Sequence, residues 1–266
     1  MNFKPLQIFI FDLDGVIYLG NELIPGAKEV LKTLTDRKKQ IFFLTNNATQ
    51  TRVKFSEKLR KMGIPAHPDQ IITSAFTTAQ VLRKSYPNAR VYIIGEEGLI
   101  NEFKEAGFQI ISEEETENPI DLVIVGLDRN VTYRKLANAL CAITNGAKFI
   151  ATNTDPTLPT DQGLLPGAGC IVAALSAAVG SEPEMIIGKP NPFMIEYILE
   201  NQQISPIAAV IIGDRYSTDI LAGLRAHIKT ILVKTGTGMQ ELQQIPSSGP
   251  QPDLILDSIA NLLDYL

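Results

Sequence analysis

The chain has 266 residues, of which 45% are hydrophobic and 20% are charged, and its formal net charge is −5. This length and composition are typical of a folded protein with one large or two medium domains and an ample core. The acidic balance argues against a nucleic acid polymer or an anionic membrane as the main partner, so a site for an anionic substrate would need local cations.

The N-terminus lacks the basic region, apolar segment and cleavage site of a secretory signal. The longest apolar stretch, Ile171–Val179, is much shorter than a membrane span. We therefore expect a cytoplasmic protein that has no membrane partner. The two cysteines, Cys141 and Cys170, lie among apolar or small residues, which predicts buried, reduced thiols rather than a disulfide or a metal site.

Short apolar runs alternate with helical patterns along the whole chain, which predicts an α/β protein with a parallel sheet. The runs that we expect to form strands are Ile8–Phe11, Ile41–Leu44, Val91–Ile94, Phe108–Ile111, Leu122–Val125, Lys148–Ala151, Met185–Ile187, Ile207–Ile212, Lys229–Val233 and Asp253–Leu256. After the first run, Ala27, Val30, Leu31 and Leu34 show the i, i+3, i+4, i+7 spacing of a helix face. The segment Thr152–Gly169 has no regular pattern and is predicted to be a long functional loop.

Polar side chains follow four of the predicted strands. In chain order they are Asp12 with Asp14, Thr45 with Asn46, Lys189, and Asp214. Each of them alone is more often a turn or cap residue. Ligands of open parallel sheets bind outside the carboxyl ends of the strands, however, so these groups together predict one shared site.

Asp12 and Asp14 lie two residues apart, so on a strand their side chains point to the same face. Two ionised carboxylates about 4 Å apart repel each other by roughly 4 kcal/mol at an effective dielectric constant near 20. Either they share protons, which raises a pKa, or a cation lies between them. Because no His or Cys is nearby, an all-oxygen set that includes Asp214 favours a hard ion, Mg²⁺ before Zn²⁺.

A magnesium ion, Lys189 and the Thr45 hydroxyl around a carboxylate would form a receptor for phosphate. His67 lies in a polar loop and His227 near a helix end, so we expect neither to act as the general base. No phosphate-binding loop of the GxxxxGK[ST] type occurs, and the TGTG sequence at 235–238 does not complete a GxGxxG motif. The economical hypothesis is an aspartyl nucleophile with a second aspartate as acid and base.

Four motifs, DLDGV, TNN, GKP and GDRYSTD, occur here in the order found in the haloacid dehalogenase superfamily of phosphohydrolases, which the chain resembles along nearly its whole length. Longer phrases such as FIFDLDGVIYLGNELIPGA and FFLTNNATQTR are similar to the NagD-like branch, subfamily IIA. That branch includes 4-nitrophenyl phosphatases, nucleotide phosphatases, phosphoglycolate phosphatases and pyridoxal phosphate phosphatases. The resemblance implies a discontinuous Rossmann-like core at 1–79 and 181–266, with an α/β cap domain of the C2 type inserted at 80–180.

The resemblance also implies roles for the residues at these positions. Asp12 would attack the phosphoryl group and become an aspartyl-phosphate, while Asp14 would protonate the leaving oxygen and then activate the hydrolytic water. Mg²⁺ would be held by Asp12, by the backbone carbonyl of Asp14 and by Asp214, with Asp219 supporting this set from outside. The residues implied to hold the phosphoryl group are Gly15, Thr45, Asn46, Asn47 and Lys189.

Substrate choice is expected to come from the cap, because the core handles only the phosphoryl group. The candidates for substrate contact in the segment 152–169 are Asn153, Asp155, Leu158 and Thr160, although the polar ones are also ordinary turn formers. Leu158 stands where pyridoxal phosphate phosphatases of this branch have a histidine, which disfavours pyridoxal phosphate as the main substrate.

The expected reaction is therefore Mg²⁺-dependent hydrolysis of small phosphorylated metabolites, because Asp14 is present and dehalogenases of the superfamily lack it. The leading substrates are 4-nitrophenyl phosphate, phosphoglycolate and nucleoside monophosphates, and the alternatives are pyridoxal phosphate and sugar phosphates. A phosphotransferase or a non-catalytic metabolite-binding protein is the alternative function. Members of the family often dimerise through the cap, so a homodimer of this kind is a further hypothesis.

Overall fold

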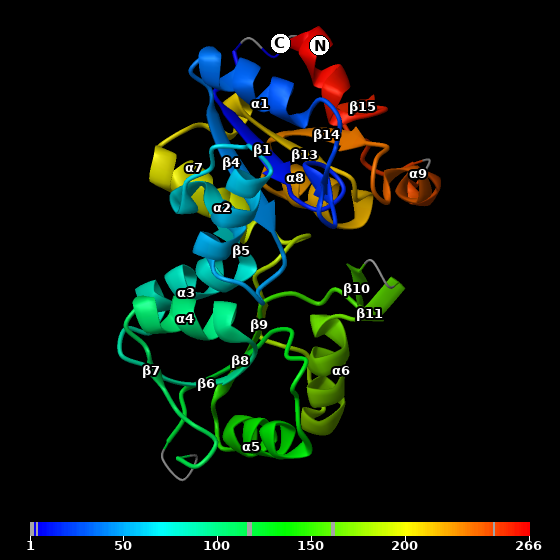
Figure 1. The fold of residues 1–266 in the computed structure, drawn as a ribbon. Coiled ribbons are helices and arrows are strands. Elements are labelled where there is room, and N and C mark those ends of the chain that lie inside the picture. The colour runs from blue at the N-terminus through cyan, green and yellow to red at the C-terminus, as the bar shows by residue number, and fades with distance from the viewer. Residues whose placement is uncertain (1–2, 4, 116–118, 161–162, 247) are drawn as a thin grey trace. The chain divides into compact units, whose positions relative to one another are not determined.

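The computed structural model describes residues 3, 5–115, 119–160, 163–246 and 248–266 (Figure 1). The chain forms two compact units. Unit 1 consists of Met1–Thr45, Phe55–Ile72 and Lys189–Leu266, and unit 2 consists of Asn46–Lys54 and Thr73–Gly188. Unit 1 is therefore discontinuous in sequence. The domain limits expected from the resemblance, 79/80 and 180/181, stay predictions.

Unit 1 contains a six-stranded sheet in the order β15–β14–β13–β1–β4–β5. The strands are β1 (Ile8–Asp12), β4 (Gln40–Thr45), β5 (Ile71–Thr73), β13 (Ala209–Gly213), β14 (Lys229–Val233) and β15 (Leu254–Leu256). The pairs from β15 to β4 are all parallel, as predicted. The register places Asp12 of β1 beside Leu44 of β4, and Phe11 beside Ile212 of β13, so the carboxyl ends of these three strands lie together.

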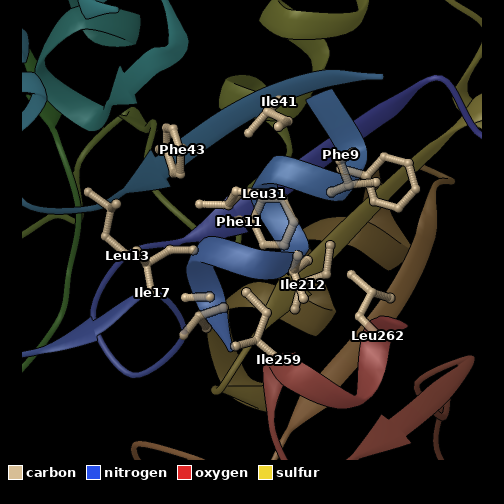
Figure 2. Close-up of a cluster of buried hydrophobic side chains, with 14 of the residues drawn as sticks. Phe9, Phe11, Leu13, Ile17, Leu31, Ile41, Phe43, Ile212, Ile259 and Leu262 are labelled. Carbon is tan, nitrogen blue, oxygen red and sulfur yellow. The ribbon is translucent and has the colours of Figure 1, made fainter. Parts of the chain in front are cut away.

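One face of this sheet is covered by helix α1 (Ala27–Asp36), which buries the four apolar positions that the sequence predicts for its inner face. Figure 2 shows Leu31 of this helix packed among Phe9 and Phe11 of β1 and Ile212 of β13. The 3-10 helix η5 (Ile259–Tyr265) completes the cluster with Ile259 and Leu262. Every residue of β1 is buried, so this strand is held rigidly on both faces.

The remaining short elements of unit 1 connect the strands. They are the antiparallel pair β2 (Tyr18–Leu19) and β3 (Glu22–Leu23), the helices α2 (Arg52–Lys61, whose first turn belongs to unit 2), α7 (Phe193–Gln202), α8 (Leu221–Arg225) and α9 (Gly238–Glu241), the 3-10 helices η1 (Pro68–Gln70), η2 (Pro206–Ala208) and η4 (Leu242–Gln244), and the π-helical turn η3 (Tyr216–Ile220). The pair β2–β3 was not predicted, because strands of two residues leave no periodic pattern in the sequence.

Unit 2 contains a five-stranded parallel sheet in the order β12–β9–β8–β6–β7. Its strands are β6 (Arg90–Ile94), β7 (Gln109–Ile110), β8 (Leu122–Val125), β9 (Lys148–Ala151) and β12 (Met185–Ile186), and its helices are α3 (Ser74–Ser85), α4 (Glu97–Glu105), α5 (Tyr133–Thr144) and α6 (Ala168–Val179). Leu122 and Ile124 of β8 pack with α3 and α4, whereas Val123 and Val125 pack with α5 and α6. Unit 2 is therefore a three-layer α/β/α unit, which confirms the predicted α/β fold class.

Two expectations from the sequence are wrong. The segment Thr152–Gly169 does not form a patternless loop, because β10 (Thr157–Thr160) and β11 (Gly163–Pro166) pair as an antiparallel hairpin. All four residues of β11 are exposed, so no buried face imposes the alternation that marks a strand. Cys141 of α5 and Cys170 of α6 are free but exposed rather than buried. No helix in the described part of the chain is both long and apolar enough to cross a bilayer.

Candidate active site

Three carboxylates meet at the carboxyl ends of β1 and β13. Asp12 is the last residue of β1, Asp214 directly follows β13, and Asp219 lies in the π-helical turn η3. One oxygen atom of each residue lies within 4.8 Å of the others, and all three residues are buried. The predicted meeting of strand-end side chains at the β1 and β13 ends is therefore present in the structure, and their donor atoms suit a hard metal ion.

A buried lysine joins this acidic cluster. The Nζ of Lys189 donates hydrogen bonds to Asp12 Oδ1 at 2.5 Å and to Asp219 Oδ1 at 2.6 Å, and only 4% of the residue is exposed. Burial alone would lower the pKa of Lys189, but Asp12 and Asp219 raise it above the ordinary lysine value. Burial also raises the pKa of Asp12, as do Asp219 and Asp214, while Lys189 opposes this effect. Lys189 thus stays cationic, and it offsets only part of the upward shift in the pKa of Asp12.

Asp214 has one oxygen that is held and one that is not. Its Oδ2 accepts hydrogen bonds from the backbone N–H of Thr237 at 2.8 Å and from the Thr237 hydroxyl at 2.9 Å. Its Oδ1 is buried and has no hydrogen-bond partner among the described residues. Burial raises the pKa of Asp214 to about 6. A buried, unsatisfied carboxylate oxygen is costly, and a cation in the cluster would satisfy it.

The turn after β1 is shaped to bring the backbone close to Asp214. Gly15 has a φ angle of +87°, and a Cβ atom at this position would lie 2.3 Å from Asp214 Oδ2. A residue with a side chain would therefore both strain the turn and displace the carboxylate. The residues present fit a divalent cation, since the donors are oxygens, one of them lacks a partner, and the glycine keeps the space beside it clear.

Two further residues, Thr235 and Thr237, support this turn, and they were not predicted as site residues from the sequence. The Thr235 hydroxyl donates a hydrogen bond to the backbone oxygen of Gly15 at 2.6 Å, and Thr237 holds Asp214. Both belong to the TGTG sequence, which the sequence analysis considered only as a nucleotide-binding loop. Because TGTG follows β14, the neighbour of β13, the same strand-end rule that identified Asp214 could have identified it.

The other predicted residues of unit 1 lie at the same strand ends. Asp14 is exposed to solvent, and the surrounding protein raises its pKa, with Lys58, Lys189 and Arg215 acting in the opposite direction. Thr45 is buried and is the last residue of β4, next to β1 in the sheet. Acidic, cationic and hydroxyl groups are thus gathered within one unit.

The predicted residues in unit 2 form a separate polar cluster. Asn46 Nδ2 donates to the two carboxylate oxygens of Asp155 at 3.0 and 3.3 Å, and Asn153 Nδ2 donates to the backbone oxygen of Asn46 at 2.9 Å. Asn47 makes a local turn, in which its Oδ1 accepts from the backbone N–H and the hydroxyl of Thr49. The structure therefore brings Asn46, Asn153 and Asp155 together.

The last two predicted residues lie in the hairpin strand β10. Leu158 lines an apolar cavity of about 460 Å³ in unit 2, together with Leu127, Leu165 and Ile171. Thr160 ends β10, but its side chain lies outside the part of the chain that the structure describes. This hairpin presents apolar rather than charged side chains to the cavity.

The parallel sheet of unit 1 carries clustered carboxylates at its strand ends, joined by a buried lysine. This arrangement is typical of an α/β enzyme whose acidic site suits a divalent cation. A model of the haloacid dehalogenase-like hydrolases matches residues 9–109, and a model described as HAD-hydrolase-like matches residues 186–262. An acid sugar phosphatase of Staphylococcus epidermidis is 41% identical over 90% of this chain and 90% of its own.

Solved structures agree with these matches. The 4-nitrophenylphosphatase of Thermotoga maritima superimposes with a TM-score of 0.91 at 33% identity, covering 98% of each chain. A thermostable NPPase of Geobacillus stearothermophilus gives a TM-score of 0.85 at 39% identity, covering 97% of this chain and 98% of its own. The chain belongs to the haloacid dehalogenase-like hydrolase family, and within it to the NagD-like phosphatases.

Replacing Lys189 with Met is expected to lower the free energy of unfolding by about 3–5 kcal/mol, because removal of one partner leaves buried charges without compensation. Chemical denaturation in metal-free buffer measures this loss. Lys32→Met is the matched control, since Lys32 also lies 2.6 Å from a carboxylate, that of Asp36, but in an exposed pair. The control should leave the unfolding midpoint nearly unchanged. Equal losses in the two variants would contradict a role for burial.

Proposed function

We propose that this enzyme is a Mg²⁺-dependent phosphomonoesterase that works through an aspartyl-phosphate on Asp12. The observation that carries the proposal is the pairing of Asp12 with Lys189 beside Asp214, whose Oδ1 is buried without a hydrogen-bond partner in the described chain. A cation between Asp12 and Asp214 would satisfy that oxygen and provide the positive charge that a phosphate ester needs.

The residues that would hold Mg²⁺ are Asp12, Asp214 and the backbone carbonyl of Asp14. Asp219 fits a supporting role, because its Oδ1 accepts from Lys189 and its Oδ2 accepts from the backbone N–H of Arg215 at 3.1 Å. When bound, Mg²⁺ would neutralise charge on the phosphoryl oxygens and on the acidic cluster.

The reaction has two steps that use the same two carboxyl groups. An oxygen of Asp12 attacks phosphorus, the bond from phosphorus to the leaving oxygen breaks, and Asp14 gives that oxygen a proton. Asp14 then takes a proton from water, whose oxygen attacks phosphorus, so inorganic phosphate leaves and Asp12 is regenerated. The raised pKa of Asp14 favours the protonated form that the first step requires.

The phosphoryl oxygens would be held by hydrogen-bond donors at the strand ends. We assign this role to Gly15, Thr45, Asn46, Asn47 and Lys189. Lys189 also fixes the orientation of Asp12, since its Nζ bridges Asp12 and Asp219. A fixed nucleophile lowers the entropic cost of reaching the transition state.

We propose small phosphorylated metabolites as substrates. Relatives named acid sugar phosphatase and 4-nitrophenylphosphatase support sugar phosphates and 4-nitrophenyl phosphate as the first to test, followed by phosphoglycolate and nucleoside monophosphates. Residues 80–180 would act as the cap that selects among them, with Leu158 and Thr160 as contacts. A cytoplasmic location, and the lack of a nucleic acid or membrane partner, stay predictions.

The wild-type protein is expected to release phosphate from 4-nitrophenyl phosphate with Mg²⁺ and to lose activity with a chelator, regaining it when Mg²⁺ is restored. Asp12→Asn should reduce the rate at least about 10³-fold, because the amide is a poor nucleophile. Circular dichroism checks that the variant is folded, and Asp36→Asn, at an exposed site, is the matched control. A wild-type rate in Asp12→Asn would contradict the assignment of the nucleophile.

Asp14→Asn is expected to separate the two steps by leaving group. The rate with a sugar phosphate should fall by about 10²-fold or more, because a sugar alkoxide needs a proton to leave. With 4-nitrophenyl phosphate, whose leaving anion is stable, the first step should continue while the second slows. Rapid-mixing kinetics should then show a burst of 4-nitrophenolate equal to the enzyme concentration. Without this burst, Asp14 would not be the residue that activates the water.

We also propose a homodimer formed through unit 2, as the family resemblance implies. The apolar cavity lies beside exposed leucines at 164 and 165, which are 70% and 43% exposed, and Val131, which is 37% exposed. Apolar surface of this kind often marks an interface. Light scattering after gel filtration should find a dimer that Leu165→Glu converts to a monomer, whereas Ile207→Glu in unit 1 should not. A monomeric wild type would contradict the proposal.

A further inference from the structure

A buried polar cluster in unit 2 lies where the chain passes from one unit to the other. The chain crosses between the units after Thr45, Lys54, Ile72 and Gly188. At the first and the last of these crossings, Asn46 is bonded to Thr45 and Gly188 is bonded to Lys189. Thr45 and Lys189 are two of the residues proposed to hold the phosphoryl group. A side chain that fixes the positions of Asn46 and Gly188 therefore acts one residue away from Thr45 and from Lys189.

Asn46 is held at its side chain and at its backbone. Its amide donates to both oxygens of Asp155, and its backbone oxygen accepts from Asn153 at 2.9 Å and from the Ser74 hydroxyl at 2.7 Å. The Oδ1 of Asn153 in turn accepts from the backbone N–H of Asp155 at 3.1 Å. Asn46, Asn153 and Ser74 are all buried. Together, the hydrogen bonds with Asp155, Asn153 and Ser74 leave Asn46 little freedom to move within unit 2.

Gly188 packs directly against the same side chain. A Cβ atom on Gly188 would lie 2.7 Å from Asn46 Oδ1, 2.7 Å from the backbone oxygen of Thr152 and 2.8 Å from Asn153 Cβ. The backbone N–H of Gly188 donates to that Thr152 oxygen at 2.7 Å, which fixes its position. Asn46 and Gly188, the unit 2 residues at the first and last crossings, are thus in contact, and no residue larger than glycine fits at position 188.

We propose that Asp155 is a positioning residue for phosphoryl binding, an inference that rests on the proposed function. By holding Asn46 against Gly188, Asp155 fixes the spacing of Thr45, which precedes Asn46, and Lys189, which follows Gly188. This role differs from the predicted one, in which Asp155 contacts the substrate. A carboxylate that touched the leaving group would discriminate among substrates, whereas one acting through Asn46 changes binding of the phosphoryl group that all substrates share.

Inorganic phosphate is the probe that separates these roles, because it has no leaving group. In Asp155→Ala, the inhibition constant of phosphate should rise about tenfold, and kcat/KM should fall by a similar factor for 4-nitrophenyl phosphate and for a sugar phosphate. Asp155→Asn, which keeps an oxygen that can accept from Asn46, should stay within about threefold of the wild type. Asp36→Ala is the matched control at an exposed aspartate and should change neither constant.

A double variant tests whether Asp155 acts through Asn46. If it does, Asn46→Ala with Asp155→Ala should be no worse than Asn46→Ala alone, because residues of one network are not additive. If Asp155→Ala does not fold, Asn153→Ala removes another hold on Asn46 and should raise the phosphate constant in the same way.

Three results would overturn the inference: an unchanged phosphate constant in Asp155→Ala, a loss confined to one substrate, or effects that multiply in the double variant. Each of these would be seen with an active wild type, so the proposed function would stand. A wild-type protein that hydrolyses neither ester would overturn the proposed function, and this inference with it.

Discussion

The structure depends on the burial of three carboxylates beside one lysine at the end of β1. Lys189 offsets part of the charge of Asp12, Asp214 and Asp219, but it cannot neutralise all three when they are ionised. Burying charge without full compensation is costly, and the apolar sheet around β1 supplies the stability that allows it. The remaining negative charge is what makes a divalent cation favourable at this point, and with it an anionic substrate in a protein whose net charge is −5.

The fold places these groups at or near the carboxyl ends of strands rather than in long loops. Because β4, β1, β13 and β14 are parallel neighbours, the residues that follow them emerge at one edge of the sheet. Thr45 and Asp12 end β4 and β1, and Asp214 and Thr237 lie in the segments that follow β13 and β14. Rigid strands hold a catalytic geometry more closely than loops do, since their backbones are fixed by the core on both faces.

The sequence predicted this edge well, because buried parallel strands give unbroken apolar runs and the polar residues after them stand out, as Asp12 and Asp214 do. It predicted poorly what depends on surface and on distant contacts. The hairpin β10–β11 has no buried face to impose a pattern, and Cys170 is exposed although its sequence neighbours are small or apolar. The strand-end rule could have placed Thr235 at this edge, but the hydrogen bond that it donates to Gly15 joins residues far apart in the chain, and a single sequence does not predict that pairing.

The same limit applies to Asn46, and there it changes the chemistry expected of the residue. From the sequence, Asn46 is one more polar group after β4, interchangeable in role with Thr45. In the structure, its amide is engaged by Asp155 and its carbonyl by Asn153 and Ser74, all within unit 2. Adjacent residues of one motif thus belong to different units, so the peptide bond between Thr45 and Asn46 ties the acidic centre of unit 1 to the unit that carries the hairpin.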